Sequence, residues 1–398
     1  MTRRCAWIRR IADAIAGAAV LALPALDLQA QPPPNTEQFV VGIGRSIHDS
    51  LGVATAMSWL GVQSMRLDAP WKSIETAPGR YAIPAWLEEA VDSARARGIE
   101  PLLILAYGHP LHGGDKPRTS LAIAAFARYA VYVTKHFEGR VRYFDLWNEW
   151  DARTGHTTPG TPDDYIALAR SVYPAIKSAT PDAIVLSGGI SSLGSGQGWV
   201  ERFIELGGLQ FVDGLSLHPY SFQQRGASAP ENAIAQLDRV HALASAASRP
   251  VPIYVTEMGY PAFEGRGGVS ADVAALYLAR FNLLASTRPH IAGVWWYCLR
   301  DQGTDRNDKE HNFGVLDATM EPKPAARALR AVAQLLSEVQ RFHDESRGTE
   351  HRISATRADG TKIVLAWSEG SVATQLLSEL AALTAQPDAR AAAHSSRR

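Results

Sequence analysis

Two glutamates end apolar stretches of the sequence in similar ways. Glu149 follows "FDLWN", and Glu257 follows "PIYVT". An ionised glutamate is almost never fully buried unless it is paired, so both positions need a chemical explanation. Cleavage of a glycosidic bond uses two carboxyl groups, because one protonates the leaving oxygen while the other attacks or directs water. The two glutamates are therefore the candidate catalytic residues.

The neighbours of the two glutamates predict different roles, since an acid and a base need different pKa values. Arg66 lies on an earlier apolar stretch and could reach a carboxylate at the centre of a site. Positive charge and the hydroxyl of Tyr220 near Glu257 would keep that carboxylate ionised. Glu149 is flanked by two indoles, and we expect it to hold a proton near neutral pH.

Eight apolar runs predict strands that would position these residues. They cover residues 39–44, 63–68, 100–108, 141–149, 183–189, 211–220, 251–260 and 291–299. Between them, apolar residues recur at helical spacing. Alternating strands and helices form either a (β/α)8 TIM barrel or a doubly wound sheet. The barrel is favoured because the count is eight, no Gly-rich phosphate motif follows the first strand, and polar residues gather at the carboxyl ends of the strands.

The rest of the chain divides into four segments around the barrel, which we place at residues 39–340. Residues 1–30 are typical of a signal peptide, with basic residues, an apolar run and a cleavage site at Ala30, and residues 31–38 form a Pro-rich linker. Residues 341–374 predict a small β appendage with a hairpin at Asp359-Gly360. Residues 375–398 are Ala-rich, and we expect a disordered tail.

These features predict a periplasmic or secreted protein with no stable membrane span after cleavage. Cleavage would remove four arginines and two aspartates, so the formal charge would be about −2. No nucleic-acid partner is expected at such a charge. No His-x-His motif or His/Asp cluster marks the strand ends, and the acidic segment 303–312 lacks EF-hand spacing. We therefore predict no metal and no cofactor.

The motifs resemble those of clan A glycoside hydrolases. The resemblance rests on "WNE" at 147–149, "HPY" at 218–220, "YVTEMGY" at 254–260, a Trp on the eighth strand and "NFGVLDATMEPKPAARAL" after it. It covers about residues 39–340. It is strongest for glycoside hydrolase family 39 and its bacterial exopolysaccharide-degrading relatives, and family 5 is next.

The resemblance implies a retaining O-glycoside hydrolase that cleaves β-glycosidic bonds of a polysaccharide or oligosaccharide. Glu149 would be the acid/base and Glu257 the nucleophile. The implied substrate-binding residues are Asn148 at the sugar 2-hydroxyl, Tyr220 and Arg66 beside Glu257, Trp296 as a platform, Tyr107 and His109 at other hydroxyls, His218 in the cleft and His48 at an outer subsite.

Three alternatives remain open on the sequence alone. One is a family 5-type endoglucanase, and another is a barrel that binds polysaccharide without cutting it. The third is a surface-assembly protein that uses its small β part. Short loops after the fifth and seventh strands favour an open groove and action within a polymer.

Overall fold

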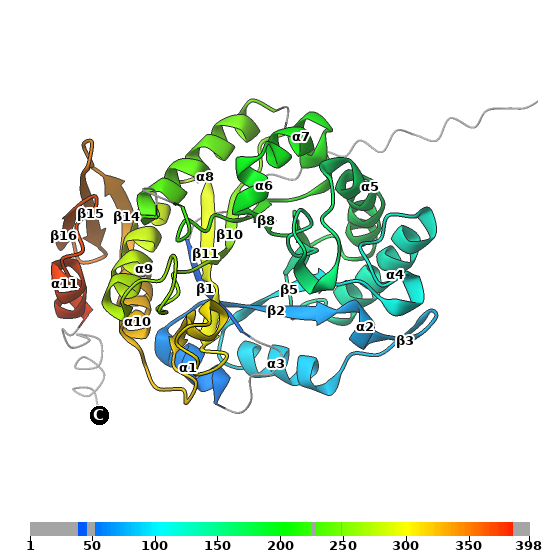
Figure 1. The fold of residues 1–398 in the computed structure, drawn as a ribbon, viewed down its shortest axis with the longest axis horizontal. Coiled ribbons are helices and arrows are strands. Elements are labelled where there is room, and N and C mark those ends of the chain that lie inside the picture. The colour runs from blue at the N-terminus through cyan, green and yellow to red at the C-terminus, as the bar shows by residue number, and fades with distance from the viewer. Residues whose placement is uncertain (1–38, 46–51, 225–227, 248, 385–398) are drawn as a thin grey trace, which may run out of the picture. The chain divides into compact units, whose positions relative to one another are not determined.

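A computed structural model describes residues 39–45, 52–224, 228–247 and 249–384. Parallel strands curl into a barrel at the centre of the ring of helices in Figure 1. Along the chain these strands are β1 (Val40–Gly44), β2 (Ser64–Pro70), β5 (Glu100–Ala106), β6 (Tyr143–Leu146), β7 (Ile184–Leu186), β8 (Ile190–Ser191), β9 (Leu215–His218), β10 (Ile253–Met258) and β11 (Ile291–Trp296). The predicted signal peptide, the linker and His48 lie outside the described residues.

Eight of the nine strand segments overlap the eight predicted strands, and β8 directly follows the fifth predicted run, so β7 and β8 together form the fifth strand of the barrel. β7 pairs with β6, and β8 pairs with β9. A parallel bridge from Leu186 to Gly214 links β7 to the entry of β9. β1 pairs with both β2 and β11. The prediction of a TIM barrel is therefore confirmed.

Helices cover the outside of the barrel. They are α1 (Val53–Leu60), α2 (Trp71–Ile74), α3 (Ala85–Arg95), α4 (Ser120–His136), α5 (Pro162–Ala179), α6 (Ser192–Gly196), α7 (Trp199–Glu205), α8 (Pro230–Ser245), α9 (Ala271–Ser286) and α10 (Pro324–Glu338). Local chemistry marks several starts. Thr161 and Asp164 form a capping box at α5, and Pro230 and Pro324 open α8 and α10, where a missing N–H costs nothing. None of the described helices is both long enough and apolar enough to span a lipid bilayer.

The inside of the barrel has an apolar half and a polar half. Leu102, Leu186, Tyr254 and Trp295 belong to a buried cluster separate from the main core. They lie on β5, β7, β10 and β11, so this cluster fills the barrel interior. Toward the carboxyl ends of the strands the buried residues become polar, namely Arg66, Asp145, Ser216, His218, Thr256 and Glu257. Active sites of such barrels lie at this end.

Three antiparallel strands follow α10, as the β appendage prediction expected. They are β14 (Val339–Asp344), β15 (Glu350–Arg357) and β16 (Lys362–Ser368), and the β15–β16 turn contains Asp359 and Gly360. A buried ion pair connects this sheet to the barrel helices. Glu231 on α8 accepts hydrogen bonds from Arg280 on α9 and from the Trp367 indole on β16, at 2.8 and 2.9 Å.

The expectation of a disordered tail from residue 375 was wrong for its first part. Residues Gln375–Thr384 form helix α11 (Figure 1), and Leu376 and Leu380 are buried. The helix contacts α9 and α10. The two buried leucines lie one helical turn apart on the same face, so packing of this face against those helices stabilises a segment for which a disordered tail was expected. Residues 385–398 lie outside the described part of the chain.

Candidate active site

A pocket of about 620 Å³ opens at the carboxyl ends of the barrel strands. Six of the predicted site residues line it, namely Arg66, Tyr107, Asn148, Glu149, Tyr220 and Glu257. They come from β2 and β10 and from the turns after β5, β6 and β9, so the fold gathers residues up to 191 positions apart. One carboxylate oxygen of Glu149 lies within 4.8 Å of one of Glu257.

Glu257 faces the barrel interior because of a bulge in β10. Val255 pairs with Val294 and Met258 with Trp296, so one extra residue separates the pairs on β10. Thr256 and Glu257 can then both face inward, although neighbouring residues of a regular strand point to opposite faces. Its Oε1 accepts a hydrogen bond from Arg66 Nη1 at 2.5 Å, and its Oε2 accepts one from Tyr220 Oη at 3.0 Å.

These contacts keep Glu257 ionised. Burial is the largest influence and by itself raises its pKa, but His218, Arg66 and the Tyr220 hydrogen bond outweigh burial, so the pKa lies below its ordinary value. The pKa of Arg66 is raised: burial lowers it, while Glu257 and Asp145 more than compensate. Arg66 Nε also donates to Asp145 at 3.1 Å. Burial raises the pKa of Tyr220, which therefore remains a donor to Glu257.

Glu149 lies in a tight turn directly after β6. Trp147 has φ 88° and Glu149 has φ 48°, both in the left-handed region that side chains with a Cβ seldom adopt. The Glu149 N–H donates to the carbonyls of Gly188 and Gly189 at 3.0 and 2.9 Å. Such backbone strain persists only where the surroundings impose it, and it is frequent at functional sites.

The break between β7 and β8 makes room for this turn. A Cβ on Gly188 would lie 2.2 Å from the Leu146 carbonyl oxygen, and one on Gly189 would lie 2.4 Å from His218 Nε2. Both glycines also have positive φ, at 76° and 57°. The pair "GG" that ended the fifth predicted strand therefore permits close approach to the Glu149 turn and to His218.

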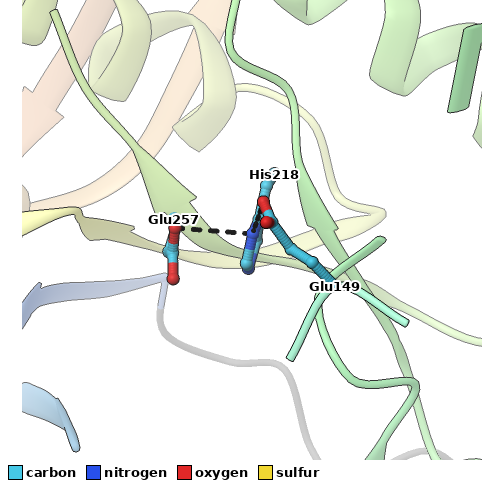
Figure 2. Close-up of side chains that lie close together, drawn as sticks. All are labelled: Glu149, His218 and Glu257. Atoms are coloured by element: carbon cyan, nitrogen blue, oxygen red, sulfur yellow. Dashed lines mark hydrogen bonds and ion pairs between the residues drawn. The ribbon is translucent and has the colours of Figure 1, made fainter. Parts of the chain in front are cut away.

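His218 lies between the two glutamates, as Figure 2 shows, but it does not line the pocket. Its Nδ1 is 3.0 Å from Glu149 Oε1 and 3.5 Å from Glu257 Oε2, and its Nε2 is 3.0 Å from Thr256 Oγ1. The ring is fully buried. His218 can thus orient both carboxylates from behind, whereas a position in the cleft had been predicted.

Glu149, His218 and Glu257 form the one group of possible metal ligands within the described residues. The atoms that could bind a metal already have hydrogen-bond or ion-pair partners. Both oxygens of Glu257 accept hydrogen bonds, and the Arg66 guanidinium beside Oε1 would repel a cation. The arrangement fits a pair of carboxylates held for proton transfer and attack, and the prediction of no metal and no cofactor stays a prediction.

Asn148 is held in one orientation beside Glu149. Its Oδ1 accepts from Arg66 Nη2 at 2.7 Å, and its Nδ2 donates to Tyr107 Oη at 3.1 Å. An amide nitrogen has two N–H donors. The second N–H of Asn148 has no partner among the described residues and is available to a ligand in the pocket.

Two predicted contacts do not agree with the structure. His109 is buried outside the pocket, where Nε2 lies 2.8 Å from the Glu75 carbonyl oxygen and Nδ1 accepts from the Leu111 N–H. Trp296 is only 2% exposed and packs on Tyr260. Strand alternation explains the second error, because Trp295 points into the barrel, Trp296 points to the helices, and Tyr297 lines the pocket instead.

Lys116 supports the loop that follows Glu149, a role that the sequence did not indicate. Its Nζ donates to the carbonyls of Ala152 and Thr158 at 3.0 and 2.8 Å and to Thr157 Oγ1 at 2.5 Å. It also lies 5.8 Å from the centres of the Trp147 and Trp150 rings. Burial lowers the pKa of Lys116 to about 8. Both indoles are buried behind the loop and do not line the pocket.

We expect Lys116→Met to loosen this loop. The substitution keeps the stem but leaves the Ala152 carbonyl and Thr157 Oγ1 without this donor, whereas Arg118 still donates to the Thr158 carbonyl. The free energy of unfolding should therefore fall by about 2–3 kcal/mol. Thermal denaturation measures the change, and Lys135→Met at an exposed position of α4 is the control. An unchanged midpoint in Lys116→Met would show that other contacts hold the loop.

No family model matches this chain, and no curated protein does. Solved structures, in contrast, share its fold. Its structural neighbours are clan A glycoside hydrolases. A family 39 glycoside hydrolase from the gut symbiont Bacteroides cellulosilyticus has 25% sequence identity and a TM-score of 0.70, over 84% of this chain and 71% of that one.

Two further neighbours show the fold at lower identity. A β-xylosidase from Caulobacter crescentus has 16% identity and a TM-score of 0.59, over 80% of this chain and 73% of that one. A family 5 enzyme from Bifidobacterium longum, solved with Manβ1-4GlcNAc, has 17% identity and a TM-score of 0.62, over 75% and 78%. The resemblance found in the motifs therefore agrees with the fold.

Proposed function

We propose that the protein is a retaining O-glycoside hydrolase that cleaves β-glycosidic bonds of a polysaccharide or oligosaccharide. The observation that carries the proposal is the short distance between the two carboxylates, with one oxygen of each within 4.8 Å. Retaining enzymes place their carboxyl groups about 5–5.5 Å apart, whereas inverting enzymes need about 6.5–9.5 Å to admit a water molecule.

In the first step, Glu257 attacks the anomeric carbon while the bond between that carbon and the leaving oxygen breaks. The lowered pKa keeps this carboxylate ionised, and Arg66 and Tyr220 hold its oxygens in place. Glu149 gives its proton to the leaving oxygen, so that the departing group leaves as a neutral alcohol. A covalent glycosyl-enzyme is the result.

In the second step, Glu149 takes a proton from a water molecule, which attacks the same carbon and releases Glu257. Two displacements restore the original configuration. His218 contacts the Glu149 carboxylate at 3.0 Å and can hold it in position while its protonation changes. The free N–H of Asn148 is suited to the sugar 2-hydroxyl, an interaction that strengthens in the transition state.

A screen of the purified protein tests the proposal. The panel contains β-linked polysaccharides, oligosaccharides and aryl β-glycosides, and released sugar is measured with the parent and with Glu257→Gln. Hydrolysis by the parent alone supports the proposal. Oligosaccharide binding without hydrolysis at any pH would instead identify a binding barrel. The predicted signal peptide further leads us to propose a periplasmic or secreted site of action.

Tyr297, rather than Trp296, is the aromatic residue that lines the pocket at this position, and this gives a second expected result. Tyr297→Ala should raise KM about tenfold, because an aromatic face in the pocket loses its contact with the apolar side of a sugar. Trp296→Phe is the matched change next to it, and it should lower the thermal midpoint with little change in KM. Steady-state kinetics on one aryl glycoside separates them, and the opposite pattern would restore Trp296 as the platform.

A further inference from the structure

Four carboxylates line the pocket, namely Asp68, Glu149, Glu257 and Glu310, and the proposed mechanism does not use Asp68. Ser64, Arg66 and Asp68 share one face of β2, since side chains two residues apart point the same way. Ser64 accepts from the indole of Trp295 at 2.9 Å within the barrel. Arg66 contacts Glu257 one layer higher, and Asp68 lines the pocket in the layer above that.

The carboxylate of Asp68 has no partner at hydrogen-bond distance among the residues that the structure describes, and this distinguishes it from its neighbours. Arg66, the nearest cation on its strand, is already bonded to Asp145, Glu257 and Asn148. Lys309, another cation at the pocket, pairs with Glu310 at 2.8 Å. Asp68 thus presents acceptor oxygens to the space that a ligand would fill.

The surroundings make an unpartnered carboxylate unfavourable. Burial raises the pKa of Asp68 to about 6; Arg66 lowers it and Glu257 raises it further. A group kept in this state destabilises the folded protein at neutral pH, and such local costs are typical of binding and catalytic positions. A ligand with O–H or N–H donors would supply the missing partners.

We propose that Asp68 determines the sugar class at this subsite by binding hydrogen-bond donors of a neutral or amino sugar and excluding a uronate. This inference rests on the proposed glycosidase function. The shared chemistry is a donor facing the carboxylate, from a pair of hydroxyls or from an ammonium group. A uronate would bring a like charge beside Asp68 and Glu257, which costs binding energy in a partly buried site.

The kinetic test compares the parent with Asp68→Asn on 4-nitrophenyl β-glycosides of glucose, galactose, mannose, xylose, glucosamine and glucuronic acid. Loss of a charged hydrogen bond should lower kcat/KM on the best sugar by about 10–100-fold. The ratio of glucuronide to neutral-sugar activity should rise. A larger loss on glucosamine identifies ammonium as the donor, and equal losses identify hydroxyls; both support the inference. The control is Asp182→Asn, an exposed carboxylate before β7.

Stability provides a readout that a merely structural Asp68 would not produce. The folded-state pKa of about 6 lies above the ordinary 3.8. The carboxyl group therefore destabilises the fold increasingly as pH rises from about 4 to 6, and fully above that. Asp68→Asn should raise the thermal midpoint at pH 7.5 and leave it unchanged near pH 3.5, while activity falls. A lower midpoint at pH 7.5 would mean that Asp68 holds the fold together, and would overturn the inference.

Different experimental outcomes overturn the role of Asp68 and the glycosidase proposal. If the parent hydrolyses a glycoside and Glu257→Gln does not, an unchanged kcat/KM in Asp68→Asn overturns the role of Asp68 alone. So does a parent that prefers the glucuronide. If the parent hydrolyses nothing, saturation-transfer NMR with the methyl β-glycosides of the same sugars measures binding directly. If the parent and Asp68→Asn bind the sugars equally, or if the parent binds none of them, the proposed role of Asp68 is overturned.

Discussion

Replacing Glu257 by glutamine is expected to abolish turnover, with kcat reduced by about 10⁴-fold or more. The amide cannot attack the anomeric carbon, so no glycosyl-enzyme can form. A 2-deoxy-2-fluoro aryl glycoside of the accepted sugar should label the parent, and peptide mass spectrometry should place the label on Glu257. Glu310→Gln, which changes another carboxyl group at the pocket, is the matched control and should still be labelled.

The same reaction has a stereochemical outcome. Proton NMR of the anomeric signal in the first minutes should show a β product, because two displacements at one carbon retain configuration. An initial α product would mean that water attacks directly and that Glu257 is not the nucleophile. Circular dichroism of Glu257→Gln is needed alongside, since the change removes a buried partner of Arg66 at 2.5 Å. Breaking such a pair can cost about 3–5 kcal/mol of stability.

The pH dependence of Glu257 follows from the direction of its shift. Its pKa is lowered in the folded protein, so its contribution to stability is present above the ordinary pKa and is lost as pH falls through the lower, folded value. The parent should therefore lose stability toward strongly acidic pH. In Glu257→Gln this part of the acid-side loss should disappear.

Glu149→Gln should give the second large effect, and one that depends on the leaving group. Activity on a natural glycoside should fall by about 10²–10⁴-fold, because its leaving oxygen needs the proton. Dinitrophenyl glycosides need little protonation, so formation of the glycosyl-enzyme should be much less affected. Steady-state and burst kinetics on both substrates measure the difference.

Azide should partly restore turnover of Glu149→Gln and form a β-glycosyl azide. The anion needs no base, and the carboxylate of Glu149 no longer repels it. Glu201→Gln, on the exterior helix α7, is the matched control and should show neither the leaving-group dependence nor the azide response. Equal losses on both substrates, with no azide product, would remove Glu149 from the acid/base role.

The barrel and the pair of glutamates could be predicted from sequence for one reason. Strands of a parallel barrel are buried on both faces and appear as apolar runs, and helices show their 3.6-residue period. Eight such runs place residues that follow them at one end of the barrel. Glu149 and Glu257, after the fourth and seventh runs, therefore had to lie in the same region, as did Arg66, Asn148 and Tyr220.

The direction of individual side chains depended on the tertiary structure. A run that is apolar on both faces does not reveal which residues point inward, so Trp296 was chosen where Tyr297 lines the pocket. The bulge that turns both Thr256 and Glu257 inward leaves no mark in the sequence. The assignment of His109 failed because its Nδ1 accepts from the nearby Leu111 N–H, while its Nε2 lies beside the Glu75 carbonyl, which only the folded chain brings close.

Support for the site came from contacts between distant segments. Lys116 holds a loop that begins 36 residues later in the chain, and nothing in its local sequence indicates this. Helix α11 similarly depends on its contacts with α9 and α10. Local pattern thus predicts which segments form the barrel and which residues reach its carboxyl end. Partners, orientation and charge environment depend on the three-dimensional packing, because each is a property of groups that meet only when the barrel closes.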